Sequence, residues 1–254
     1  MPSVTIRFYQ ELNEFLPPAR RKAPVTTSFA HGNTVKALIE DLGVPHTEVD
    51  LVLVNGQSVD FSRQLRDGDM VSVYPVFESL DIGSITRVRS RPLRETRFAL
   101  DVHLGTLARL LRMFGFDSLY GSAISDEDLV LSARQQGRII LTRDRGLLKR
   151  RLVTHGYLVR SMQPPLQVTE VLRRFDLAGS LRLFARCMRC NGQIARCTKA
   201  EVRESLPGVV AETYDDFSRC ASCGRVYWKG SHWEKMQDLV AGVREALRTG
   251  RPGP

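Results

Sequence analysis

The feature that most constrains the fold is a series of short apolar segments that alternate with helical patterns between residues 97 and 183. Strands are expected at residues 98–100, 118–120, 139–141 and 157–159. Helical spacing of apolar residues separates them, and Gly115 and Gly137 are placed to end two of the helices. Because strands that alternate with helices build parallel sheets covered on both faces, we predict an α/β domain over residues 97–183.

The first 79 residues follow a different pattern. Strands are expected at residues 4–8, 25–29, 51–54 and 70–74, with a helix capped by Thr34 and a tight turn at Asn55-Gly56. This order of elements predicts a small ubiquitin-like β-grasp domain over residues 1–79.

Part of this segment resembles the sulfur-carrier proteins of thiamine and molybdopterin synthesis, at Val54-Asn55-Gly56 and at Tyr74-Pro75. The resemblance implies transfer from a free Gly-Gly carboxylate. Here Phe77-Glu78-Ser79 continues into another domain, and the chain ends in Pro-Gly-Pro. We therefore expect a β-grasp that docks a protein partner or acts as a scaffold.

Charge divides the chain unevenly. The formal net charge is +9, yet residues 1–79 hold 7 Lys and Arg against 10 Asp and Glu. Residues 80–96 have no apolar periodicity and carry several arginines, which predicts a basic linker, either a solvated tether or a binding segment. The basic remainder either attracts a polyanionic partner such as nucleic acid or reflects a coding bias toward arginine, which supplies 31 of the 37 basic residues.

The cysteines are arranged for metal binding. Cys187 and Cys190 form one Cys-x-x-Cys turn, and Cys220 and Cys223 form another. Four thiolates complete a tetrahedral structural zinc site, whereas a redox dithiol needs only one pair. We predict a zinc ribbon followed by a helix over residues 184–254, with Cys197 outside the site.

Two aromatic residues follow the second turn. Tyr227 and Trp228 can either pack in the core of this small domain or stack on a nucleic-acid base. The sequence leaves both roles open.

The chain has no run of about 20 apolar residues and no N-terminal secretory pattern. Five cysteines are too few for a disulfide framework in 254 residues. We therefore expect a cytoplasmic protein without membrane partners.

Carboxylates follow the expected parallel strands. Asp101 and Asp144 stand after two of them, and Asp126 opens the helix that follows a third. Such strand ends form ligand sites in open α/β sheets, and clustered carboxylates suit Mg²⁺ or Mn²⁺. The alternative is that these acids only cap helices or turns. Nearby arginines suited to gripping phosphates are Arg109, Arg112, Arg143 and Arg145.

These motifs resemble the bacterial Mut-seven C-terminal ribonuclease family, which has a PIN-like fold. The resemblance rests on residues 98–105, 107–112, 115–117, 125–129 and 141–145 and on the ribbon motif 224–232. It implies a Mg²⁺- or Mn²⁺-dependent acidic site in which Asp101 and Asp144 are the strand-end carboxylates. Asp126 is the acid chosen between them, with Glu127 as its substitute.

We therefore expect a ribonuclease whose substrate is RNA, with tRNA or the ribosome as candidate partners. The alternative is a non-catalytic RNA-, tRNA- or ribosome-binding protein that keeps the nuclease fold. Asp117 precedes a strand, at the opposite end of the sheet, and is a weak candidate for a fourth acid.

Overall fold

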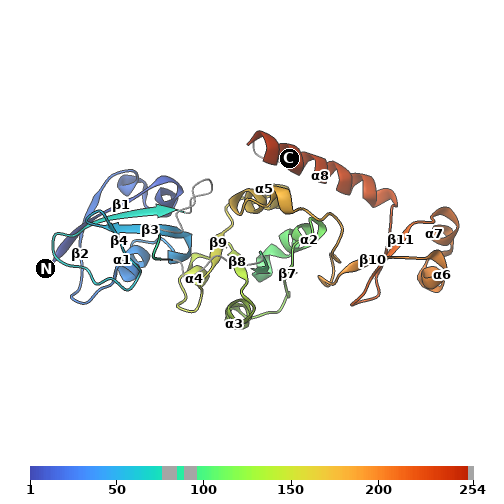
Figure 1. Cartoon of the computed structure of the whole chain (residues 1–254), viewed down its shortest axis with the longest axis horizontal. Coiled ribbons are helices and arrows are strands. Elements are labelled where there is room, and N and C mark those ends of the chain that lie inside the picture. The colour runs from blue at the N-terminus through green and yellow to red at the C-terminus, as the bar shows by residue number, and fades with distance from the viewer. Residues whose placement is uncertain (76–84, 89–95, 251–254) are drawn as a thin grey trace. The chain divides into compact units, whose positions relative to one another are not determined.

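The computed structural model describes residues 1–75, 85–88 and 96–250 (Figure 1). The described residues form two compact units. The first comprises Met1–Glu95 and Asp144–Leu158, and the second comprises Thr96–Arg143 and Val159–Pro254. Most of the basic linker expected at residues 80–96 lies outside the described residues, and its role stays a prediction. The predicted domain limits, 1–79, 97–183 and 184–254, likewise stay predictions.

The first unit contains the predicted β-grasp sheet. Its strands are β1 (Ser3–Phe8), β2 (Val25–Ser28), β3 (Val49–Val54), β4 (Gln57–Ser58) and β5 (Met70–Pro75), in the order β2-β1-β5-β3-β4. β1 runs parallel to β5, and the other pairs are antiparallel. Helix α1 (Val35–Asp41) begins after Thr34, whose hydroxyl accepts a hydrogen bond from the Ala37 N–H at 3.3 Å. Val35, Leu38 and Ile39 bury one face of α1.

The Asn55-Gly56 turn joins β3 to β4 as predicted. Asn55 has φ 52° and Gly56 has φ 81°, the left-handed conformations that a two-residue hairpin turn requires. The Asn55 side chain also donates to Asp69 Oδ1 at 2.9 Å and accepts from the Met70 N–H at 2.9 Å. Asn55 therefore fixes both the hairpin and the start of β5.

Three short 3₁₀ helices complete this part of the first unit: η1 (Gln10–Phe15), η2 (Pro18–Arg20) and η3 (His46–Glu48). Leu12 and Phe15 of η1 are buried in the core. Apolar periodicity does not predict these helices because segments of three to six residues are too short to show a repeating pattern.

A segment from the expected α/β region packs with the β-grasp. It carries α4 (Arg145–Leu148) and β9 (Gly156–Leu158). His46 joins the Glu40 carboxylate at 2.7 Å to the Val153 carbonyl at 2.8 Å. The buried Glu48 accepts the Leu158 N–H at 2.7 Å. The core of the first unit is thus completed by residues distant in sequence.

The second unit contains the predicted parallel strands. They are β6 (Phe98–Leu100), β7 (Ser118–Leu119) and β8 (Ile139–Thr142). β6 runs parallel to both β7 and β8 and is fully buried. Helices α2 (Gly105–Met113) and α5 (Pro164–Arg174) pack together on one side, and α3 (Asp126–Gln136) packs against β6 and β8 on the other (Figure 1). Two single turns, η4 (Val102–Leu104) and η5 (Ala178–Ser180), follow β6 and α5.

Gly115 ends α2 for a steric reason as well as a conformational one. Its φ is +100°, and a Cβ at this position would lie 2.4 Å from the Arg182 carbonyl oxygen. The chain that leads to the cysteines therefore passes directly over the end of α2, and only glycine leaves room for it.

The C-terminal part of this unit is a three-stranded antiparallel ribbon. Its strands, in the order β10-β11-β12, are β10 (Ile194–Cys197), β11 (Phe217–Cys220) and β12 (Val226–Trp228). α6 (Lys199–Val202), η6 (Arg203–Ser205) and α7 (Gly208–Thr213) lie between β10 and β11. The long interval between the two Cys-x-x-Cys motifs is therefore a helical insertion in a ribbon.

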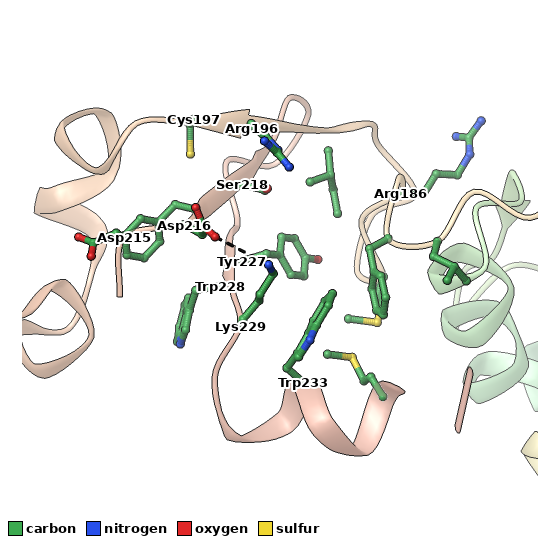
Figure 2. A pocket seen from close by; sticks show the side chains of 16 residues that line it. Arg186, Arg196, Cys197, Asp215, Asp216, Ser218, Tyr227, Trp228, Lys229 and Trp233 are labelled. Atoms are coloured by element: carbon green, nitrogen blue, oxygen red, sulfur yellow. Dashed lines mark ion pairs between the residues drawn. The ribbon is translucent and has the colours of Figure 1, made fainter. Parts of the chain in front are cut away.

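Helix α8 (Ser231–Thr249) packs its C-terminal half on α5, where Val240, Val243 and Ala246 are buried and Arg173 donates to the Ala246 carbonyl at 3.0 Å. At the other end of α8, Trp233 lies with Tyr227 and Trp228 around a pocket beside the ribbon (Figure 2). None of the described helices has both the length and the apolar surface needed to cross a bilayer.

Candidate functional site

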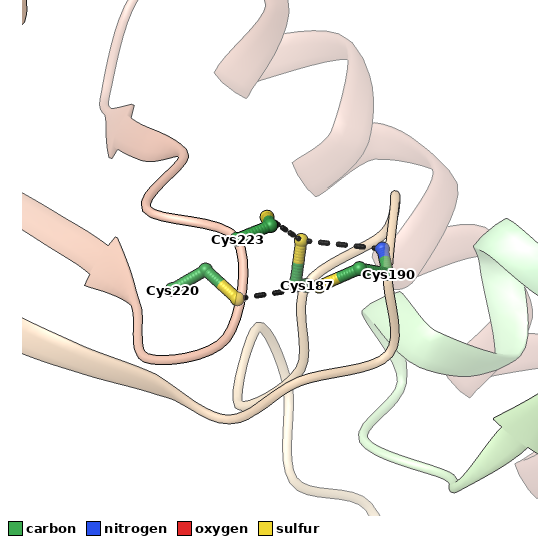
Figure 3. Close-up of side chains that lie close together, drawn as sticks. All are labelled: Cys187, Cys190, Cys220 and Cys223. Carbon is green, nitrogen blue, oxygen red and sulfur yellow. Dashed lines mark hydrogen bonds between the residues drawn. The ribbon is translucent and has the colours of Figure 1, made fainter.

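The two Cys-x-x-Cys turns of the second unit face each other (Figure 3). In the first, the Asn191 N–H donates to the Cys187 carbonyl at 2.9 Å. In the second, the Gly224 N–H donates to the Cys220 carbonyl at 3.0 Å. Asn191 and Gly224 occupy equivalent positions and have φ values of 70° and 71°. The two turns therefore share one backbone conformation, which presents both thiols of each pair to the same side.

The four sulfur atoms of the cluster lie within 4.8 Å of one another. Cys187 Sγ is 3.7 Å from Cys223 Sγ, and Cys190 Sγ is 3.4 Å from Cys220 Sγ. Sulfurs bound at about 2.3 Å to one tetrahedral zinc ion are about 3.8 Å apart, whereas a disulfide requires about 2.05 Å. All five cysteines are free thiols, and Cys197 lies outside the cluster. The cluster thus fits one tetrahedral ion such as zinc, as predicted.

Cys187 is prepared for metal binding by its hydrogen bonds. Burial acts to raise the pKa of its thiol, but the Tyr227 hydroxyl at 3.1 Å and the Cys190 N–H at 3.5 Å stabilise the thiolate. These donors outweigh burial and lower the pKa of Cys187 to about 6. The thiolate, which is the form that binds metal, therefore predominates at neutral pH.

Arg112, which we expected to grip a phosphate, lies in the interior. Only 4% of its surface is exposed. Its Nε and Nη2 donate to the Ser118 carbonyl at 3.0 and 2.7 Å, and its Nη1 donates to the carbonyls of Met188 and Arg189 at 3.1 and 3.0 Å. Arg112 therefore links β7 to the first cysteine turn, and these carbonyls take up the donors that a phosphate would need.

Asp117 makes a second link between the same elements. Its Oδ1 accepts from Arg138 Nη1 at 2.6 Å and from the Asn191 side chain at 2.8 Å, and Arg186 Nη2 lies 3.8 Å from its Oδ2. Burial acts to raise the pKa of Asp117, but these donors and charges outweigh it and hold that pKa below its usual value. The position before β7, which made Asp117 a weak catalytic candidate, suits this connecting role. The sequence did not predict this connecting role because Arg138, Arg186 and Asn191 are distant from Asp117 along the chain.

Asp101 lies where the sequence placed it, directly after β6. It is 5% exposed, and its Oδ1 accepts from the His103 N–H at 2.6 Å. Its Oδ2 accepts a short hydrogen bond from the hydroxyl of Thr142, the last residue of β8. Because β6 and β8 are parallel, this contact joins their carboxyl ends. Asp101 is therefore a buried carboxylate held at the sheet edge where α/β proteins form sites.

The acidic residues at the start of α3 are exposed. Ser125 caps the helix by accepting from the Asp128 N–H at 3.1 Å, and it donates to the Asp128 carboxylate at 2.7 Å. Asp126 and Glu127 occupy the first turn. Asp128 is thus committed to the cap, and its two neighbours are exposed on the same turn.

The remaining predicted site residues follow β8. Arg143 is exposed and belongs to the second unit. Asp144, in the first unit, caps α4 by accepting from the Gly146 N–H at 2.7 Å. Arg145 lies over the Phe15 ring, 5.1 Å from its centroid. Among the described residues, the four cysteines form the one group of three or more His, Cys, Asp or Glu ligands close enough to share an ion.

Beside the cysteine turns lies a cavity of about 720 Å³, which we call the cationic groove. Its lining includes Arg109, Arg112, Arg189, Arg225, Tyr120 and Tyr227, and no carboxylate. In the described part of the chain, no ion pair neutralises Arg109, Arg189 or Arg225. Positive charges that converge in this way attract anions. Arg189 and Arg225 join Arg109 here because the cysteine turns bring them together, which helical spacing does not predict.

The groove begins beside Asp101. His103 lines it, and the backbone N–H of the same residue donates to Asp101. At its floor, Tyr120 donates to the Val102 carbonyl at 3.1 Å. A Cβ on Gly105 would lie 2.5 Å from the Tyr120 hydroxyl, so α2 begins close to the end of this ring.

A β-grasp sheet, a parallel α/β core and a four-cysteine ribbon define a multidomain protein that combines an α/β domain with a metal-binding ribbon. The family model of the Mut7-C RNAse domain matches residues 96–240, and the Mut7-C ubiquitin model matches residues 1–81. The chain therefore belongs to the Mut7-C RNAse domain family, and the predicted architecture is confirmed. No curated protein matches the chain, and no solved structure does.

Proposed function

We propose that the protein is a metal-dependent ribonuclease that hydrolyses RNA phosphodiester bonds at the carboxyl ends of β6 and β8. The observation that carries the proposal is the buried Asp101 carboxylate, held by Thr142 and His103 in a domain of an RNAse family. A carboxylate buried for structure alone is costly. Its position after the central strand suits a ligand that faces a reacting phosphate.

The ion would be held by carboxylates alone. We assign this role to Asp101, with Asp126, or Glu127 in its place, and Asp144 as the further acids that the ion would recruit, since among the described residues these carboxylates do not form a ligand group without it. Oxygen ligands of this kind suit Mg²⁺ or Mn²⁺. When bound, such an ion activates water and stabilises charge on the phosphate oxygens.

Residues of the chain itself would orient the Asp101 carboxylate and hold the RNA phosphates. Thr142 and His103 donate to different oxygens of Asp101, so the carboxylate keeps one orientation. In the proposal Arg109, Arg189 and Arg225 bind the RNA phosphates, and the exposed Arg143 and Arg145 flank Asp144 in sequence. Cys187, Cys190, Cys220 and Cys223 would hold a zinc ion that fixes the turn carrying Arg189, while Arg112 and Asp117 join this turn to the sheet.

We further propose that the β-grasp docks a protein partner and that the protein acts on tRNA or at the ribosome. The five free cysteines suit the reducing cytoplasm, which we propose as the location.

Cleavage of single-stranded RNA and of tRNA by the zinc-loaded full chain tests the proposal. Cleavage should require added Mn²⁺ or Mg²⁺. Asp101→Asn and Asp144→Asn should each lower the rate by about 100-fold or more, since an ion contributes several kcal/mol to the transition state. Asp126→Asn should lower the rate as well.

Asp128→Asn is the matched control, because Asp128 lies on the same helical turn but serves the cap. Its rate should stay within about threefold of wild type, since a capping change affects the helix rather than the reaction. RNA that binds tightly but stays intact would favour the non-catalytic binding protein. Full cleavage by Asp101→Asn would overturn the assignment.

A further inference from the structure

A second cavity lies beside the ribbon, next to the first turn of α8 (Figure 2). We call it the aromatic pocket. Its volume is about 380 Å³, and its lining includes Phe184, Tyr227, Trp228 and Trp233. Trp228 comes from β12 and Trp233 from α8, and both rings are half-buried. These are the two tryptophans of the whole chain.

The rings form a fixed apolar surface. Trp233 packs on Phe184 with ring centroids 4.4 Å apart. Lys229 Nζ lies 6.0 Å from the centroid of Trp233 and 3.7 Å from the Asp216 carboxylate, and Figure 2 shows Lys229 between the two indoles. Asp215 and Arg196 add charges of both signs to the lining. Aromatic walls with a mixed polar rim suit a flat ring whose edges carry donors and acceptors.

The aromatic pocket and the cationic groove share two residues. Met188 and Tyr227 line both cavities, so these two side chains beside the cysteine cluster form a common wall. The groove offers unpaired arginines, and the pocket offers aromatic faces. A single-stranded nucleic acid presents the matching pair of features, charged phosphates and exposed bases, along one backbone.

We propose that the aromatic pocket binds one unpaired nucleobase of an RNA strand whose phosphates lie in the cationic groove. The inference rests on the proposed function for the nature of the ligand. The base stacks on Trp228 or Trp233, and its edge meets the polar groups of the rim. Recognition of a base beside the zinc ribbon thereby selects single-stranded over paired RNA.

Tryptophan fluorescence reports this site directly, because no tryptophan lies elsewhere in the chain. The zinc-loaded full chain is titrated with an unstructured single-stranded RNA in the absence of added Mg²⁺ or Mn²⁺. Saturable quenching is expected, and the same RNA annealed to its complement should quench far less. Ribose 5-phosphate, which carries the charge without a base, should not quench. Equal quenching by ribose 5-phosphate, or none by single-stranded RNA, would overturn the proposal.

Two substitutions of Trp228 distinguish stacking of this ring on a base from its packing within the protein. Trp228→Leu keeps apolar bulk but removes the ring, and it should weaken single-stranded RNA binding about tenfold. Trp228→Phe keeps a ring and should stay within about threefold of wild type. Zinc content and thermal unfolding show that each variant is folded, and Trp233→Leu provides a second position. Equal affinities for all of these variants would contradict the proposal.

The outcomes for the pocket and for the ribonuclease are distinguishable. Metal-dependent cleavage that Asp101→Asn abolishes, together with fluorescence that RNA leaves unchanged, would overturn the pocket alone. Saturable quenching by single-stranded RNA without any cleavage would support the pocket and overturn the ribonuclease.

Discussion

The hydroxyl of Thr142 donates a hydrogen bond to Asp101 Oδ2 between the carboxyl ends of two adjacent parallel strands. Thr142 is fully buried, and Asp101 is 5% exposed. With the His103 N–H on Oδ1, this contact compensates the desolvation of the carboxylate and fixes its direction. Thr142 therefore positions the residue on which the proposed reaction depends.

Replacing Thr142 by valine removes the hydroxyl at nearly constant volume. We expect Thr142→Val to fold and to lower RNA cleavage by about 10–100-fold, as loss of a partner behind a metal ligand typically does. Thr142→Ser, which keeps the donor, should retain most activity. Single-turnover cleavage rates measure both. Equal rates for the valine variant and wild type would show that this contact does not support catalysis.

Two arginines on α2 have different roles: Arg112 stabilises the fold, and Arg109 is proposed to bind RNA. Arg112→Met leaves buried carbonyls without donors, so it should lower the free energy of unfolding by about 2–4 kcal/mol. The exposed Arg109→Met should leave stability within about 0.5 kcal/mol and weaken RNA binding. Urea unfolding and RNA titrations on both variants check this. A stable Arg112→Met variant would contradict the structural role.

The four-cysteine cluster predicts how many zinc ions each chain binds. Elemental analysis should find about one zinc per chain. Cys187→Ser and Cys223→Ser should lose it, together with metal-binding free energy on the order of 10 kcal/mol, and unfold the ribbon. Cys197→Ser is the matched control and should keep zinc, because Cys197 lies outside the cluster. Zinc lost from Cys197→Ser, or retained in Cys187→Ser, would refute the assignment.

Asp117 gives the protein a defined acid sensitivity. Because its pKa is lowered on folding from 3.8, its contribution to stability is complete above about pH 3.8 and is lost as pH falls through the lower value. Asp117→Asn should therefore cost about 1–3 kcal/mol at pH 7, and this difference should vanish in strong acid. Denaturant unfolding of both proteins from pH 7 to pH 2 measures the difference. A difference that does not change with pH would exclude Asp117 as its source.

Local patterns predicted most of the regular structure. Thr34 and Ser125 cap the helices that they were expected to begin, and Gly115 and Gly137 end theirs in left-handed conformations. The Cys-x-x-Cys spacing identified the metal cluster. These features depend on residues within a few positions of one another, so the sequence records them directly.

Contacts between residues that are distant along the chain could not be predicted from local patterns. Arg112 has helical neighbours typical of a surface residue, but its carbonyl partners include Met188 and Arg189. His46 contacts Val153 more than 100 positions along the chain. The aromatic pocket forms only when β12 and α8 meet, so the sequence could not decide between core packing and base stacking for Trp228. The position of Asp101 at the edge of the parallel sheet was predictable, because this residue directly follows a strand that could be recognised from its apolar sequence.

Binding of Mn²⁺ to the zinc-loaded protein, measured by electron paramagnetic resonance, tests the proposed carboxylate site most directly. We expect saturable Mn²⁺ binding by wild type and by Asp128→Asn, and a loss of affinity of about 10-fold or more in Asp101→Asn. Wild-type protein that binds no Mn²⁺, or an Asp101→Asn variant that binds it equally well, would rule out the carboxylate site.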